Sequence, residues 1–218
     1  MNRPSRTSVA VAGCLAIGAL LLAGCASDPE PTPSPNPSQS ASSGPTPPPT
    51  SMPTPTVAAP DPADVTSWVI SAAGFGPIAR GAAFPDVATP LTAFELAPVD
   101  EACPSLFTLS RDDTASLLLM VPEGGDQVED VWVSGSPDAS GALPVAPRTA
   151  EGIGLGSTLE ELTAAYPGLQ QIAQLSAEGF GYAVGDDETG WIDFIVVEGA
   201  VTSIGSSAEP RAPKEFCG

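Results

Sequence analysis

The chain has 218 residues and a formal net charge of −19, with 26 acidic and 7 basic side chains. Such an acidic chain lacks the basic footprint that binding to phosphates requires, so the composition predicts no nucleic-acid partner. There is no histidine, which removes the commonest general base and the commonest metal ligand. Zinc hydrolysis and Ser-His-Asp catalysis are therefore excluded, and the sequence predicts no metal site and no cofactor.

Residues 1–24 predict a signal peptide, because Arg3 and Arg6 precede an apolar run at residues 9–22. This run is shorter than the roughly 20 residues that a membrane-spanning helix needs. Residues 22–25, Leu-Ala-Gly-Cys, resemble the lipobox of bacterial lipoproteins, which are cut before the cysteine. The resemblance implies that Cys25 carries a diacylglycerol with acyl chains such as palmitate, and that the protein is lipid-anchored at the extracytoplasmic face of the cell membrane.

Two alternatives to this anchor remain open. Cys14 ends a similar Val-Ala-Gly-Cys sequence, although a cut there leaves almost no apolar run before it, and Cys25 can be an incidental residue of an ordinary secretory signal. Removal of residues 1–24 leaves five basic and 26 acidic side chains, which gives the mature chain a formal charge of −21. The plainest interpretation of this charge is a solvated surface that keeps an exported protein soluble.

Residues 25–64 consist mainly of Pro, Ser, Thr and Ala, a composition that cannot bury a core. Alternating prolines favour extended polyproline II at about 3.1 Å per residue, so this segment is predicted to be a disordered, semi-rigid tether. Its Ser and Thr side chains are candidates for O-mannosylation, and its PxxP elements for binding to a partner.

Residues 65–218 are sufficient for one domain, and they contain two similar units at about 68–143 and 148–217. Residues 76–87 align with residues 151–162 at a constant offset of 75, and both segments predict a turn that leads into a short helix. In the second copy, Ser157 and Glu160 match the capping-box pattern. Ala82 occupies the first position of the corresponding pattern in the first copy, where it cannot cap.

Downstream of each helix the apolar pattern has a period of two, which predicts strands. The predicted strands are 93–96, 106–110, 116–121 and 128–133 in the first unit, and 169–175, 180–184, 191–197 and 200–205 in the second. Residues 65–73 fit either a helix or a strand, and we favour a strand. The predicted fold class is therefore α+β, with two helix-plus-four-strand repeats that form one antiparallel sheet with the helices on one face.

Cys103 and Cys217 are the two cysteines that follow Cys25, and an even pair in an oxidising compartment predicts a disulfide. The alternative is a nucleophilic cysteine, but no histidine exists to activate it. The paired glycine-rich turns and these two cysteines resemble secreted and lipid-anchored actinobacterial proteins, which in turn look like the tandem-repeat β-lactamase inhibitor protein. This resemblance covers roughly residues 68–217 and implies an eight-stranded antiparallel sheet; inhibitor activity does not follow from it.

Trp132, Trp191 and Asp193 are the candidate partner-binding residues, because the alternation of the two strands places both indoles on the face away from the helices. Large aromatic rings beside carboxylates suit protein recognition. The alternative is that both tryptophans are ordinary packing residues.

The acidic pairs Asp112 with Asp113, and Asp186 with Asp187, are the only candidates for carboxylate catalysis, although adjacent carboxylates in turns are typical of exposed loops. We therefore predict that the chain is not an enzyme. The predicted function is a non-enzymatic binding or structural module at the cell envelope, and an envelope or secreted protein is its expected partner. The alternatives are a β-lactamase-inhibitor-like regulator of such a protein and a carboxylate-based hydrolase.

Overall fold

The computed structural model describes residues 59–217. The predicted signal peptide, Cys25 and all of the tether before residue 59 lie outside these residues. Within residues 59–217, no helix is long and apolar enough to cross a membrane.

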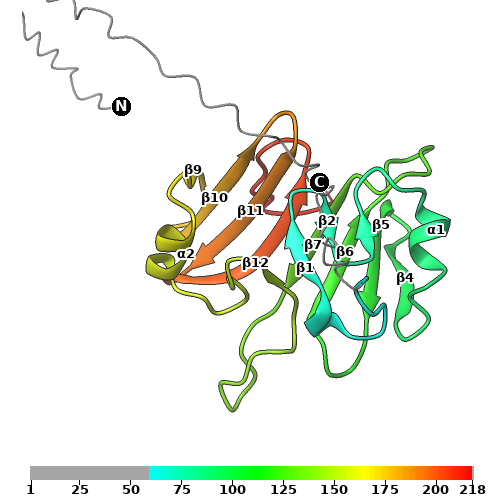
Figure 1. Cartoon of the computed structure of the whole chain (residues 1–218), viewed down its shortest axis with the longest axis horizontal. Coiled ribbons are helices and arrows are strands. Elements are labelled where there is room, and N and C mark those ends of the chain that lie inside the picture. The colour runs from blue at the N-terminus through cyan, green and yellow to red at the C-terminus, as the bar shows by residue number, and fades with distance from the viewer. Residues whose placement is uncertain (1–58, 218) are drawn as a thin grey trace, which may run out of the picture. The chain divides into compact units, whose positions relative to one another are not determined.

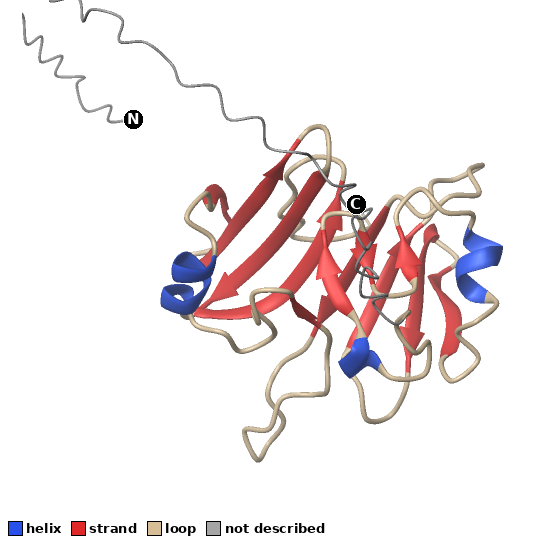
Figure 2. Cartoon of the chain, viewed as in Figure 1, coloured by secondary structure: helices blue, strands red, loops and turns tan. Residues whose placement is uncertain are grey.

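Twelve strands form two sheets in the described part of the chain (Figures 1 and 2). The large sheet has eight antiparallel strands in the order β4-β5-β6-β7-β12-β11-β10-β9. These strands are β4 (Glu95–Asp100), β5 (Cys103–Ser110), β6 (Ser116–Met120), β7 (Asp130–Ser134), β9 (Gln170–Gln174), β10 (Gly179–Asp186), β11 (Gly190–Val197) and β12 (Ala200–Ser207). The chain therefore forms two four-stranded meanders whose last strands, β7 and β12, pair at the centre.

The small sheet has the order β3-β2-β1-β8 and packs over β7, β11 and β12 at the middle of the large sheet (Figure 1). Its strands are β1 (Val69–Ser71), β2 (Gly74–Phe75), β3 (Ile78–Ala79) and β8 (Arg148–Thr149). Strands β1 and β8 pair in parallel although they lie far apart in the sequence, with Val69 opposite Arg148. The ambiguous residues 65–73 contain both structures: a 3-10 helix at Val65–Ser67 and then β1.

The predicted α+β class is wrong, because the described chain is mostly β, with 42% strand and 9% helix in two sheets. Besides the 3-10 helix, helical structure in residues 59–217 is limited to α1 (Phe84–Ala88) and α2 (Leu159–Ala165), which lie at opposite ends of the large sheet in Figure 1. Each helix buries only one side chain completely, Val87 in α1 and Leu162 in α2. Helices this short cannot cover the sheet, and the small sheet supplies the rest of the second layer.

The core lies between the two sheets. Ile70, Phe75 and Ile78 of the small sheet belong to the same buried cluster as Phe194 and Ile204 of the large sheet. Each such side chain, removed completely from water, contributes about 1.5 to 3 kcal/mol. This packing determines which face of the large sheet is internal, so alternate residues of β7 and β11 must point to the opposite face.

The cap of α2 lies one residue beyond the predicted position. Thr158, not Ser157, is the N-cap: its Oγ1 accepts a hydrogen bond from the backbone N–H of Glu161 at 3.1 Å, and Oε2 of Glu161 accepts one from the Thr158 N–H at 2.8 Å. The backbone of Ser157 is still bonded to Val201 near the start of β12, so the helix begins later. In the first copy the N-cap is Ala83, which has no capping side chain and precedes a proline.

We expect Thr158→Ala to lower the free energy of unfolding by about 1 kcal/mol, because the Glu161 N–H loses its side-chain acceptor, while the bond from the backbone N–H of residue 158 to Glu161 remains possible. Urea unfolding measures this change. The matched control is Thr163→Ala, an exposed threonine in the same helix, which should change stability by less than about 0.5 kcal/mol. Equal effects of the two substitutions would contradict the assigned cap.

Candidate functional site

The three predicted partner-binding residues lie on the face of the large sheet that points away from the small sheet. Val131 and Val133 of β7 and Phe194 of β11 belong to the core cluster, so Trp132 and Asp193 alternate with them and point the other way. The structure thus brings these side chains to one face, as predicted. They are nevertheless buried: the exposed fractions are 1% for Trp132, 8% for Trp191 and 0% for Asp193.

The C-terminal segment (residues 208–217) covers this face after the end of β12. Phe216 packs edge-on against the ring of Trp132, with ring centroids 5.4 Å apart. Ala212 lies so close to Gly181 of β10 that a Cβ there would come within 2.2 Å of the alanine methyl. The face to which the sequence assigned the partner-binding residues is therefore covered around them by the chain's own end, and binding of a partner at Trp132 and Trp191 stays a prediction.

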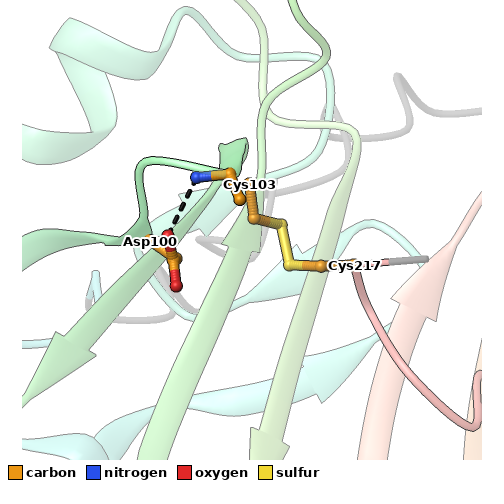
Figure 3. Close-up of a disulfide and its surroundings, with 4 residues drawn as sticks. Asp100, Cys103 and Cys217 are labelled. Atoms are coloured by element: carbon orange, nitrogen blue, oxygen red, sulfur yellow. Dashed lines mark hydrogen bonds between the residues drawn. A yellow bond between two sulfur atoms is a disulfide. The ribbon is translucent and has the colours of Figure 1, made fainter.

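A disulfide between Cys103 and Cys217 holds the end of this segment to the start of β5 (Figure 3). The two Cα atoms are 5.8 Å apart, and the cysteines are separated by 114 residues in the sequence. The adjacent turn is closed by a hydrogen bond of 2.9 Å from the backbone N–H of Ala102 to Oδ1 of Asp100. The predicted pairing of the two cysteines is confirmed.

Trp132 also requires a glycine beside it. Gly205 of β12 lies opposite Trp132 in the register, and a Cβ at that position would come within 2.5 Å of the indole. The indole thus lies flat over the backbone of β12, beneath Phe216. This packing indicates a structural role for Trp132 in holding the C-terminal segment.

A buried polar cluster lies beside the indole. Asp193 accepts hydrogen bonds from the Ser207 hydroxyl and from the backbone N–H of Arg211, the second at 2.8 Å. The Arg211 guanidinium forms an ion pair with Asp130 of β7. Oδ1 of Asp130 and the indole N–H of Trp191 are both buried and have no hydrogen-bond partner among the described residues. Arg211 therefore connects the C-terminal segment to carboxylates on both halves of the sheet.

These carboxylates lie in surroundings that disfavour their charged forms. Burial raises the pKa of Asp193 to about 6, and the hydrogen bonds from Ser207 and Arg211 only partly oppose this effect. Burial also raises the pKa of Asp130, although the Arg211 charge opposes the shift. The repulsion between Asp130 and Asp193 contributes to the raised pKa of Asp193.

We expect the domain to become less stable as the pH rises from 5 to 7. The folded protein keeps a proton on Asp193 up to a pKa of about 6, whereas the unfolded chain releases it near a pKa of 3.8. Between pH 3.8 and about pH 6 the folded state therefore binds more protons than the unfolded state, so stability falls as the pH rises. The stabilisation is complete below the unfolded-state pKa and is lost as the pH passes the folded-state pKa. Between pH 5 and pH 7 the loss is about 1 kcal/mol, because part of the change occurs below pH 5 and one pKa unit corresponds to about 1.4 kcal/mol.

Urea unfolding at pH 5 and at pH 7 measures this dependence. Asp193→Asn removes the titrating group and should flatten the profile between these two values. Asp187→Asn, a change of an exposed carboxylate in the turn between β10 and β11, is the control and should leave the slope intact. A stability that is equal or higher at pH 7 in the unmodified protein would contradict the expected role of Asp193.

The acidic pairs considered for catalysis lie in or beside turns: Asp112, Asp113 and Asp187 are turn residues, and Asp186 is the last residue of β10. Asp113 forms an ion pair of 2.7 Å with Arg111, and Oδ1 of Asp186 accepts hydrogen bonds from the backbone N–H groups of Glu188 and Thr189 at 3.0 and 2.7 Å. These bonds hold the pKa values of both carboxyls below the usual range. Within residues 59–217, no group of three or more acidic or cysteine side chains is placed to hold a metal ion.

An apolar depression lies on the outer side of the small sheet, and sequence reasoning missed it. One cavity of about 450 Å³ is lined by three exposed apolar side chains. These are Val69, Leu143 and Val145, with exposed fractions of 49%, 39% and 43%. Trp68 and Arg148 also line it. Clustered exposed apolar side chains are typical of interaction sites. Leu143 and Val145 lie in a proline-containing loop without any periodic pattern, so no local signal could have indicated that they meet Val69.

Comparisons with protein-family models, with curated proteins and with solved structures found no significant match to this chain.

Proposed function

We propose that this protein is a lipid-anchored module of the cell envelope that binds a partner protein on the extracytoplasmic side of the membrane. Three features support an exported location: the basic and apolar leader, the lipobox-like residues before Cys25, and the disulfide between Cys103 and Cys217. Disulfides persist in oxidising compartments and are rare in the cytosol. The strongly acidic composition agrees with a solvated domain held above the membrane.

The apolar depression is the observation that carries the binding role. Val69, Leu143 and Val145 account for three of the five large hydrophobic side chains that are exposed within residues 59–217. They gather around one cavity whose lining also includes Thr66, Arg148 and Thr149, and a mixed apolar and polar surface of this kind suits a protein partner. A partner that buries this area would gain hydrophobic free energy in proportion to the area removed from water.

The anchor is tested by detergent phase partition of the full chain expressed in a bacterium with lipoprotein processing. The unmodified protein is expected in the detergent phase, and Cys25→Ala in the aqueous phase. Cys14→Ala is the matched control, because it removes the other leader cysteine and should leave partition unchanged. Aqueous partition of the unmodified protein, or loss of anchoring in the Cys14 variant alone, would contradict the assignment of Cys25.

Binding is tested separately by site-specific photo-crosslinking in intact cells, with a photoreactive phenylalanine analogue placed at Val145. We expect a discrete adduct from this position. Val99, a valine of β4 with an exposed fraction of 44%, is the control position and should give none. Identical adducts from both positions, or no adduct from Val145, would contradict binding at the depression without bearing on the lipid anchor.

A further inference from the structure

The two outermost strands of the large sheet, β4 and β9, differ in how their free edges are protected. Within residues 59–217, β4 pairs only with β5 and β9 only with β10. An edge strand exposes unpaired backbone N–H and C=O groups, and natural proteins protect such edges with charged side chains, prolines or bulges. Both strands contain one irregularity in register, so bulges do not distinguish them.

Strand β4 carries the other protective features. Pro98 cannot donate a backbone hydrogen bond, and Glu95 and Asp100 place a charge at each end of the strand. An extended segment that approached this edge would lose a hydrogen bond at the proline and would meet carboxylates at both ends. The edge of β4 is therefore closed to strand addition.

Strand β9 has the sequence Gln-Gln-Ile-Ala-Gln, with no proline and no charge. Gln170, Gln171 and Gln174 are exposed, while Ile172 and Ala173 are half-buried. An uncharged edge of this kind is unusual in a chain of net charge −19. Its backbone is available to a further strand, which is how several domains bind extended peptides.

Carboxylates nevertheless lie beyond both ends of β9, in the turns before and after β10. At one end, Gln174 pairs with Phe180 of β10, and Glu178 lies two residues before Phe180. The carbonyl of Glu178 accepts a hydrogen bond of 3.0 Å from the backbone N–H of Glu198, which holds this turn in place. At the other end, Gln170 pairs with Ala183, so the turn with Asp186, Asp187 and Glu188 begins about 10 Å further along β10. The edge is thus neutral along β9 itself, and acidic turns lie beyond both of its ends.

We propose that the outer edge of β9 binds an extended segment of another protein as an added strand, and that this segment is neutral in its middle and carries lysine or arginine on both flanks. A second copy of this chain fits less well. Antiparallel pairing of two β9 strands would bring the end beside Glu178 against the partner's acidic turn, and like charges across a strand pair are unfavourable. This surface is separate from the apolar depression, so the inference goes beyond the proposed function.

The test uses the full chain, purified in detergent, and a short fluorescein-labelled peptide with alternating threonine and valine in its middle and lysines at both ends. Fluorescence anisotropy is expected to show saturable binding. Glu178→Gln combined with Asp187→Asn should weaken binding about threefold or more, because two exposed charges in the turns beyond the ends of β9 are removed. Glu123→Gln, in the exposed turn between β6 and β7, is the control and should not change the affinity.

Two further measurements make the assignment specific. The same peptide with alternate backbone nitrogens methylated keeps its charges but cannot pair as a strand, so it should not bind. Hydrogen exchange with mass spectrometry should show slower exchange at residues 169–175 when the unmodified peptide is bound, with no change at residues 95–100.

The inference is overturned by equal binding of the methylated peptide, which would indicate charge attraction alone, or by protection that appears elsewhere than β9. Absence of binding to the unmodified peptide also overturns it. Sedimentation of the peptide-free protein as a dimer, with β9 protected in the dimer, would show that the edge is occupied by a second copy.

Discussion

Replacing both Cys103 and Cys217 by serine is expected to lower the free energy of unfolding by about 4 to 5 kcal/mol. The disulfide joins cysteines 114 residues apart, so its loss releases a long loop in the unfolded chain and increases the entropy of that state. For a domain of this size the melting temperature should fall by roughly 10 °C or more.

Urea unfolding with and without dithiothreitol measures this effect. Reduction of the unmodified protein should reproduce the stability of the double variant, and the double variant itself should not respond to the reductant. Hydrogen exchange should also become faster across residues 208–217, because the covalent link is then lost and only non-covalent contacts, such as those of Phe216 and Arg211, hold the segment. A loss of less than about 1 kcal/mol would show that loop closure contributes little here.

Trp132→Ala should lower the free energy of unfolding by about 3 to 5 kcal/mol. The indole is 1% exposed, lies over the backbone at Gly205 and packs against Phe216, so alanine leaves a cavity that the rigid sheet cannot close. The substitution also removes an aromatic contact that holds the C-terminal segment to the sheet.

Thermal and urea unfolding of the Trp132 variant measure this loss. Val99→Ala, at an exposed position on β4, is the control and should change stability by less than about 0.5 kcal/mol. A Trp132 variant that unfolds cooperatively with unchanged stability would show that the C-terminal segment does not cover the indole in solution. The open face that the sequence predicted would then be restored as a candidate for partner binding.

The positions of the strands in the large sheet could be predicted from the sequence, because alternation of apolar and polar residues is a local pattern. All eight predicted segments coincide with strands to within a few residues, from residues 93–96 at β4 to residues 200–205 at β12. The offset of 75 residues also matched the first residues of the two helices, Phe84 and Leu159. The predicted N-cap of the second helix was wrong by one residue, because Ser157 and Thr158 both start a capping pattern in the sequence. The Ser157 carbonyl accepts a hydrogen bond from the Val201 N–H, so the helix begins after Thr158 instead.

The sequence did not indicate the layer that covers the large sheet. Strands of two or three residues are too short to show a period, and β8 joins β1 by a parallel pairing from the far side of the first meander. The sequence therefore predicted that the helices cover the large sheet, whereas the small sheet packs against its middle. The apolar depression depends on the same pairing, because Val69 and the loop with Leu143 and Val145 meet only when β8 is in place.

The sequence by itself determined the disulfide, the strands of the large sheet and the shared face of Trp132 and Asp193, since the count of cysteines and the alternation along a strand do not depend on distant residues. Only the tertiary structure decided that this face is covered. Whether a side chain on a sheet reaches solvent depends on which other segment lies over it, and here that segment follows β12 and is held by Arg211, Phe216 and Cys217. The residues chosen for recognition are buried for this reason, and three exposed apolar side chains, Val69, Leu143 and Val145, lie instead on the outer side of the small sheet.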